Sequence, residues 1–213
     1  MTEHAGLLTH SRIRTHKTCK RKDYIQYEHR IRAVQESHAL RFGTAMHRAI
    51  ELLATEGLHE ALGYLASTHG QWQDMFTEYT LLALVRGYQE NYYDHPLIIE
   101  PIATEVVFAL PIVNPDTGAP SRTFRQGGKI DSIAKLPDGR VVIHEIKTTS
   151  EDPSDENYWR RILIDPQVTM YYLAARELGH DIQTIIYDVI RKPAMQPALA
   201  TPIEKRKYTK DGR

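Results

Sequence analysis

The chain has 213 residues, of which 41% are hydrophobic and 25% charged, the proportions of a folded globular protein rather than of a disordered segment. Its formal net charge is zero, and its one cysteine, Cys19, excludes a disulfide framework, an all-cysteine zinc site and a four-cysteine iron–sulfur cluster. No apolar run reaches the length of a membrane span, and residues 1–17 lack the apolar core of a signal peptide, so we expect a cytoplasmic protein without a membrane partner.

The charges are unevenly distributed along the chain. Residues 12–32 contain eight Lys or Arg and only two acids, and residues 204–213 are also basic, so the remainder is net acidic. Phosphates attract such a basic arm regardless of base sequence. A solvated helix face is the alternative interpretation of the same charges.

Helical spacing of apolar residues predicts a helical first part. Helices are expected over residues 18–33, 40–56, 58–68 and 72–93. The second has the clearest pattern, with Ala45, Ala49 and Leu52 at helical intervals after Thr44. Pro96 is expected to end the helical run, because proline cannot continue a helix.

From about residue 98 the pattern changes to alternation rich in Ile and Val. Strands are expected over residues 98–113, 127–136, 140–148 and 182–193. The turn Pro137-Asp138-Gly139 predicts a hairpin between the second and third strands. A charged loop over residues 149–160 and a helix from about Asp165 to Leu178 precede the last strand. This order predicts an α/β (α+β) fold around a mixed sheet, with a loosely ordered tail after residue 193.

Three charged residues in the hairpin form a candidate site. Alternation places Glu145 and Lys147 on one face of the third strand, and antiparallel pairing can bring Asp131 of the second strand to that face. Two carboxylates suit Mg²⁺, which prefers oxygen ligands. The lysine could orient or deprotonate a water molecule, or neutralise developing negative charge. Two ion pairs on a solvated strand are the alternative that these three residues leave open.

Further motifs carry a family resemblance. Gly-Lys-Ile-Asp131 followed by Glu145-Ile-Lys147 resembles the D-(x)n-E-x-K core of the PD-(D/E)XK nuclease superfamily. Gln167 and Tyr171, one helical turn apart, resemble the Q-x-x-x-Y motif of its RecB/AddB/Cas4-like branch. "FGTAMHRAIE" resembles the G-x-x-x-H segment of that branch, and "TCKRKDYIQY" resembles its opening helix, with a lysine in place of the usual proline.

The resemblance implies a fold and an activity. The fold would be a restriction-endonuclease-like core, a mixed central sheet flanked by helices with an N-terminal helical region. Residues 1–213 would form a single nuclease domain, with a mainly helical part over 1–95, a catalytic sheet core over 96–192 and a flexible or truncated tail over 193–213. The activity would be metal-dependent hydrolysis of DNA by an exonuclease that acts in recombination, repair or phage genome processing.

The resemblance also implies roles for individual residues. The metal ligands would be His47, Asp131, Glu145 and the backbone carbonyl of Ile146, and the metal would be Mg²⁺ or Mn²⁺. The catalytic residues would be Asp131, Glu145, Lys147, Gln167 and Tyr171, the last two binding the scissile region or steadying the lysine. The basic arm would contact the DNA backbone through Arg12, Arg14, Lys17, Lys20, Arg21 and Lys22.

Some features remain open or depart from the family. Glu51 could support His47 or face solvent, and Glu105 could have a structural or a functional role. Cys19 stands alone, so the iron–sulfur cluster of some relatives is not expected. DNA is the expected partner, and a recombination or single-strand-annealing protein a further one. The alternatives are an inactive DNA-binding or assembly module, a structure-specific endonuclease, and a hydrolase of small phosphorylated substrates.

Overall fold

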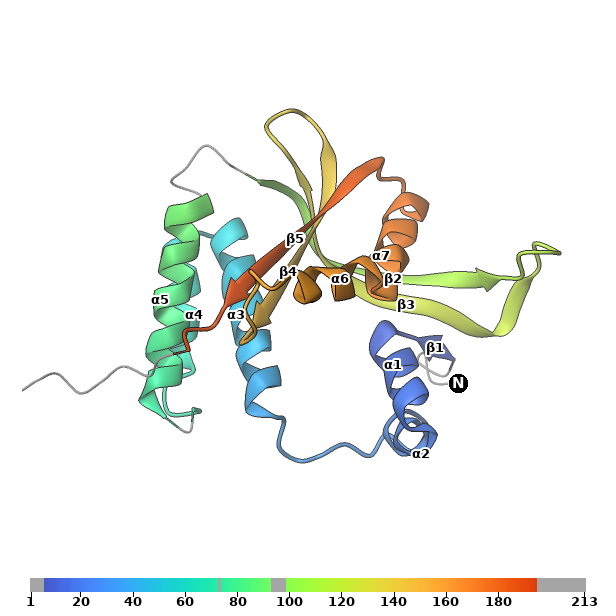
Figure 1. Cartoon of the computed structure of the whole chain (residues 1–213), viewed down its shortest axis with the longest axis horizontal. Coiled ribbons are helices and arrows are strands. Elements are labelled where there is room, and N and C mark those ends of the chain that lie inside the picture. The colour runs from blue at the N-terminus through green and yellow to red at the C-terminus, as the bar shows by residue number, and fades with distance from the viewer. Residues whose placement is uncertain (1–5, 73, 93–98, 195–213) are drawn as a thin grey trace, which may run out of the picture.

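The computed structural model describes residues 6–72, 74–92 and 99–194, and every statement below refers to these residues (Figure 1). The helices are α1 (His10–Thr18), α2 (Lys20–Asp23), the short π-helix η1 (Tyr24–Glu28), α3 (His38–Thr55), α4 (Leu58–Ser67), α5 (Met75–Tyr92), α6 (Glu156–Leu163) and α7 (Pro166–Glu177). The strands are β1 (Leu7–Leu8), β2 (Glu100–Val113), β3 (Pro120–Lys135), β4 (Val141–Thr149) and β5 (Ile182–Arg191).

The sheet is covered by helices on both faces. On one face α3, α4 and α5 form an apolar cluster around Met46 and Leu81, which Ile146 of β4 and Ile190 of β5 complete. On the other face α7 packs Ala174 and other apolar side chains against β3 and β4. This mixed α/β arrangement confirms the predicted fold class, a central mixed sheet flanked by helices.

The strand order makes the sheet fork at β3. Strand β2 pairs antiparallel with β3 along most of its length, and β5 runs parallel to β4 as far as Thr149. In contrast, β4 pairs with β3 only from Ser132 to Lys135, and β1 pairs with it only at Arg125 and Gln126. Residues 127–131 of β3 therefore have no strand partner on that edge within the described pairings. Figure 1 shows the long β2–β3 hairpin extending to one side and β4–β5 running toward α3 on the other.

Most predicted elements are present within a few residues of their expected limits. The predicted helix over 40–56 corresponds to α3, which Ser37 caps by accepting a hydrogen bond from the Leu40 N–H. The strand predicted over 127–136 begins earlier, at Pro120, because the hairpin with β2 continues well beyond the sheet core. Pro96 and most of the tail after residue 193 lie outside the described residues.

Two local predictions were wrong, and one strand was missed. The helix expected over residues 18–33 is divided at Cys19, whose extended backbone (φ −158°, ψ 104°) ends α1 and precedes α2, and helical structure stops at Glu28 instead of residue 33. A helix, α6, occupies much of the predicted charged loop; Asp155 caps it, and Arg160 and Arg161 lie favourably in its last turn. Strand β1 was missed, because two residues are too few to show a period.

No helix in the described part combines the length and the apolar character that crossing a bilayer requires.

Candidate active site

Asp131 lies at the fork of the sheet. The pairing of Ser132 with His144 would place Asp131 opposite Glu145 one step further along, but the two strands separate there. The carboxylate of Asp131 instead accepts a hydrogen bond from the backbone N–H of Ile146, with an O–N distance of 3.0 Å. A side chain thus replaces the next bond of the strand ladder, and it fixes the carboxylate between the two arms of the fork.

Strand β4 directs alternate side chains to opposite faces, as predicted. His144 and Ile146 face the helical layer of α3 and α5, where Ile146 joins the apolar cluster. Glu145 and Lys147 lie on the opposite face, and the Lys147 ammonium donates a hydrogen bond to Oε1 of Glu145. Glu145 is only 2% exposed, so the pair does not lie on a solvated strand.

Helix α3 brings His47 to the same place. Its Nδ1 lies 3.3 Å from Oδ1 of Asp131, and its side chain is partly exposed to the cleft beside α3. Two residues further along α3, Ala49 is fully buried in the apolar cluster that joins this helix to the sheet. The packing of α3 therefore sets the approach of the imidazole to the carboxylate.

Helix α7 contributes the Gln167–Tyr171 pair. The amide of Gln167 donates to the hydroxyl of Tyr171 at 2.8 Å, and the tyrosine ring packs edge-on against Phe108 of β2. Gly128 of β3 leaves room for both rings, because a Cβ there would lie 2.7 Å from the Phe108 ring and 3.2 Å from Tyr171. The orientation of the tyrosine hydroxyl is thus set by a side-chain partner and by close packing.

One cleft collects these residues. It has a volume of about 790 Å³ and is bordered by α1, α3, α7 and the open edge of β3. The predicted site side chains that line it are His47, Asp131, Glu145, Lys147, Gln167 and Tyr171. Glu51 and Glu105 line it as well, and Glu105 forms an ion pair with Lys129.

The two carboxylates have different electrostatic environments. Burial raises the pKa of Glu145 to about 7; the nearby Asp131 charge adds to this effect, and Lys147 opposes it. Burial alone would also raise the pKa of Asp131, but hydrogen bonding to His47, the charges of His47 and Lys147 and the Ile146 N–H outweigh it, and that pKa is lowered. The site therefore holds one readily ionised carboxylate beside one that titrates near neutral pH.

The donor set fits a hard divalent cation in its chemistry. An imidazole and two carboxylates line one cleft, and Oε2 of Glu145 is buried without a hydrogen-bond partner. Within the described residues, no three His, Cys, Asp or Glu side chains lie close enough together to hold a metal as they stand. Asp131 contacts His47, and Glu145 contacts Lys147 through Oε1, which leaves Oε2 of Glu145 as its unpartnered oxygen.

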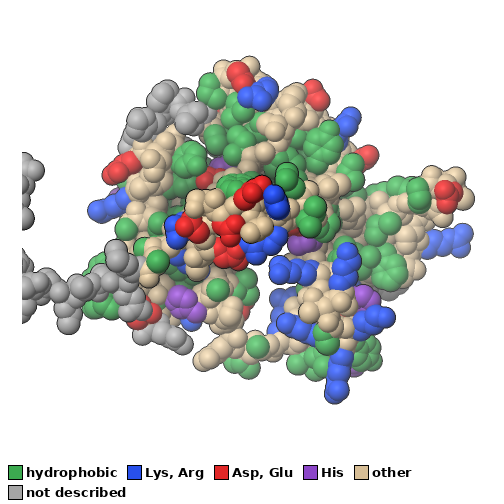
Figure 2. Space-filling view, in the orientation of Figure 1, with side chains coloured by type: hydrophobic (Ala, Val, Ile, Leu, Met, Phe, Trp, Pro, Cys, Tyr) green, Lys and Arg blue, Asp and Glu red, His purple; other side chains and the backbone are tan. Residues whose placement is uncertain are grey.

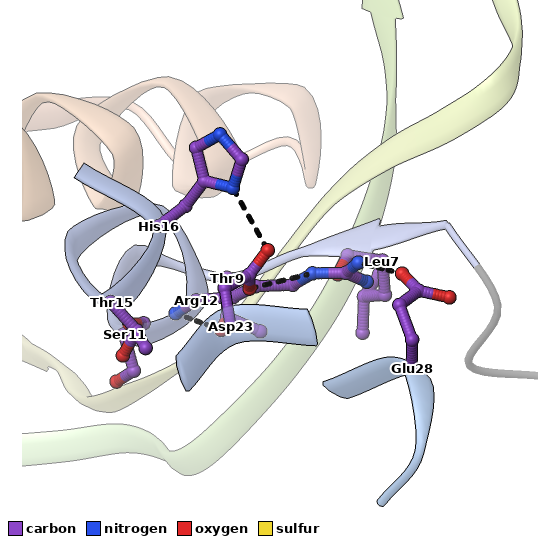
Figure 3. A network of polar contacts seen from close by, with 8 residues as sticks. All are labelled: Leu7, Thr9, Ser11, Arg12, Thr15, His16, Asp23 and Glu28. Atoms are coloured by element: carbon purple, nitrogen blue, oxygen red, sulfur yellow. Dashed lines mark hydrogen bonds and ion pairs between the residues drawn. The ribbon is translucent and has the colours of Figure 1, made fainter. Parts of the chain in front are cut away.

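Arg12 requires a correction, because it is not an exposed phosphate contact. It is 7% exposed, and its guanidinium contacts Asp23, Glu28 and the carbonyl of Leu7 (Figure 3). His16 also contacts Asp23, with an N–O distance of 2.9 Å. This network fixes α1 to α2 and η1, so Arg12 is a structural residue. Counting basic residues in a sequence cannot reveal such a buried pairing.

The other basic residues of the arm are exposed. They are the five other predicted DNA contacts, Arg14, Lys17, Lys20, Arg21 and Lys22, together with Arg30 and Arg32. Figure 2 shows Lys and Arg side chains gathered over the region of α1 and α2. The arm is thus a folded basic unit beside the cleft rather than a loose extension.

Two residues at the cleft had no sequence signal or only a weak one. His10 of α1 lines the cleft, and its Nε2 lies 3.3 Å from the Asp165 carboxylate. Glu105 has a left-handed backbone (φ 53°), which is uncommon for a residue other than glycine. The register of β2 with β3 places it opposite Asp131, so acids from β2, β3 and β4 form a row across the fork.

The chain was compared with solved structures, with curated proteins and with models of protein families. The crystal structure of SSO0001 aligns at 13% sequence identity over 76% of this chain and 67% of that chain, with a TM-score of 0.26, which is too low to bear on the fold. No curated protein matches the chain. The family model of the PD-(D/E)XK nuclease superfamily matches residues 7–210, which include every element described above. The chain therefore belongs to the PD-(D/E)XK nuclease superfamily.

Proposed function

We propose that this nuclease is a Mg²⁺- or Mn²⁺-dependent deoxyribonuclease of the RecB-like branch, and that it degrades DNA from ends. The observation that carries the proposal is the meeting of His47, Asp131, Glu145 and Lys147 at the fork of the sheet, in one cleft. The Gln167–Tyr171 pair in the same cleft supports the branch. Continuity of the apolar core from α3 to β4 and β5 supports one domain.

The metal would be held by His47, Asp131, Glu145 and the backbone carbonyl of Ile146. When bound, it would polarise the scissile phosphate and lower the pKa of a coordinated water. Asp131 is prepared for this role, because the Ile146 N–H fixes one of its oxygens and His47 contacts the other. The buried Oε2 of Glu145 is free to accept a ligand or a proton.

Lys147 would act on the attacking water and the phosphate. Its ammonium already donates to Glu145, and a water or phosphate oxygen in the cleft could accept from the same group. The positive charge would offset charge that develops on the phosphate oxygens in the transition state. Gln167 and Tyr171 would limit the positions open to the strand beside the lysine.

The basic unit of α1 and α2 would hold the DNA backbone without reading sequence. His10 and Ser11 at the start of α1 line the cleft, so the exposed cations further along that helix adjoin it. These interactions would be with phosphates and would weaken with salt. A recombination partner protein is inferred from the resemblance alone.

Incubation of the protein with linear and circular DNA, each with Mg²⁺, Mn²⁺ or chelator, tests the proposal. Loss of linear DNA alone indicates an exonuclease, whereas loss of both forms supports the endonuclease alternative. A nucleotide-monoester substrate in the same assay tests the small-substrate alternative. Absence of metal-dependent cleavage under all these conditions would leave the inactive binding module as the interpretation.

Lys147→Ala should reduce cleavage by at least about a hundredfold, because it removes a charge that acts in the transition state. The Lys147 side chain is partly exposed and belongs to neither apolar cluster, so the fold should persist by circular dichroism. Asp131→Ala should also lose metal binding, measured by calorimetry. Lys135→Ala is the control, since that lysine is exposed on β3 and does not line the cleft. Persistent cleavage by both site variants would refute the assignment.

A further inference from the structure

A second cleft adjoins the active-site cleft at Lys147. It has a volume of about 460 Å³, within the range of small-ligand sites, and is formed by α1, the end of β4, α6 and the start of α7. The two clefts share His10, Ser11, Lys147 and Gln167 in their linings. One extended ligand can therefore contact Lys147 and the linings of both clefts.

The lining of this second cleft suits a phosphate. Arg14 comes from α1 and Arg161 from α6, so exposed guanidinium groups approach from two different helices. Thr148, Thr149 and Tyr158, which carry hydroxyl groups, also line this cleft. Guanidinium groups bind phosphate oxygens through paired hydrogen bonds, and hydroxyls can donate further ones.

The acids of the cleft are already paired. Glu151 forms an ion pair with Arg161, and Asp165 lies 3.3 Å from His10 and accepts the Gln167 N–H as the cap of α7. Glu151 is exposed, so its pair with Arg161 gains little in water. A phosphodiester, whose two non-bridging oxygens share one negative charge, could replace that carboxylate on the arginine.

We infer that the second cleft binds a phosphate next to the scissile phosphate on the same nucleic-acid strand, and that Arg14 and Arg161 contact it. The inference rests on the proposed nuclease function, because continuity with the active-site cleft at Lys147 favours a polymeric ligand over a separate small one. Tyr158 and Tyr187 also line the cleft, where Arg161 lies over the ring of Tyr158 at 5.6 Å and Lys147 lies over the ring of Tyr187 at 6.0 Å, so the two tyrosines help to hold these cations in the lining. The strand would thus run past the lysine, held on both sides of the reacting phosphate.

Helix α6 supplies a matched control. Arg160 precedes Arg161, is exposed like it, and forms a similar pair with Glu156 at 2.8 Å, but neither residue lines the cleft. Arg160→Ala and Arg161→Ala therefore remove equal charge from adjacent positions. Glu151→Gln and Glu156→Gln form the corresponding acidic pair of variants.

The experiment measures binding of a labelled single-stranded oligonucleotide to the full chain by fluorescence anisotropy, in chelator and over a range of salt. Arg14→Ala and Arg161→Ala should each weaken binding about tenfold, and Arg160→Ala less than about twofold. The plot of log Kd against log salt should become shallower by about 0.7 for each phosphate that a variant no longer neutralises. Glu151→Gln should tighten binding a few-fold, because it frees Arg161, and Glu156→Gln should not.

Cleavage by each variant separates this inference from the proposed function. If Arg14→Ala and Arg161→Ala match Arg160→Ala in affinity and salt slope while the protein still degrades DNA, the second cleft is not a phosphate site and the nuclease function stands. If the unmodified protein neither binds nor cleaves DNA, both fail. Stronger binding of an acidic peptide than of the oligonucleotide would identify a protein ligand and overturn the inference.

Discussion

Replacement of Glu145 by glutamine should stabilise the metal-free fold while it abolishes cleavage. Burial raises the pKa of this carboxyl from 4.5 to about 7, and one oxygen has no hydrogen-bond partner. Below pH 4.5 the carboxyl is protonated in the folded and the unfolded chain, so it does not lower the free energy of unfolding. The loss of stability appears as the pH rises from 4.5 and is complete above about 7, where the carboxyl is ionised in both states.

The magnitude follows from the pKa difference. At about 1.4 kcal/mol per pKa unit, the penalty at pH 8 approaches about 3 kcal/mol, and at pH 5 it is below about 1 kcal/mol. Glutamine keeps an oxygen for Lys147 but leaves its amide in the unpartnered position, so part of the gain is offset. We expect Glu145→Gln to gain about 2 kcal/mol at pH 8, a rise in Tm of about 4–8 °C.

Thermal unfolding followed by circular dichroism at pH 5 and pH 8, in chelator, measures this effect. Glu105→Gln is the control, because that carboxylate lines the same cleft and also pairs with a lysine, but its side chain is 27% exposed against 3% for Glu145. A gain of similar size at both pH values would show that burial of the charge is not its cause. A lower Tm for Glu145→Gln at pH 8 would refute the reasoning altogether.

Two further predictions concern the support of the site. Asp188→Ala should cost about 3–5 kcal/mol in urea unfolding, because it removes a buried carboxylate that contacts the hydroxyls of Tyr88 (2.7 Å) and Tyr92 (2.9 Å) and the ring of His144 (3.2 Å). Burial would raise the pKa of Asp188, but hydrogen bonds from His144 and Tyr88 outweigh it and lower that pKa. The stabilisation should therefore be present above pH 3.8 and be lost as the pH falls below that value. A cost under about 1 kcal/mol would contradict the prediction. Gly6→Ala should detach β1, because the φ of Gly6 is +91° and a Cβ would overlap the Thr123 carbonyl. Strand β1 leads directly into α1, which lines the cleft, so steady-state kinetics should show a higher KM for DNA with little change in kcat.

Sequence patterns predicted the parts of the site that depend on local geometry. Period-two alternation placed Glu145 and Lys147 on one face of a strand, and helical spacing paired Gln167 with Tyr171. Both predictions hold because side-chain direction within a strand or helix is fixed by the backbone itself. The hairpin turn at Pro137–Gly139 likewise indicated that Asp131 lies near Glu145.

The remaining features depend on contacts between distant segments. The fork at Asp131 arises because β4 continues alongside β5 while β3 continues alongside β2. No local sequence pattern shows which strands pair in this way. The burial of Arg12 depends on Asp23 and Glu28 folding back on it, which a count of charges does not show. Helix α6 was missed because it is eight residues long and begins among polar turn residues.

The open edge of β3 has a consequence for solubility. An unpaired strand edge usually invites a strand from another molecule and so promotes aggregation. Here the free segment covers only residues 127–131, and β1 and β4 occupy the same edge on either side of it. An incoming strand would meet these two neighbours before it could form a ladder of useful length. The short unpaired segment therefore gives a second copy of the chain little edge with which to pair.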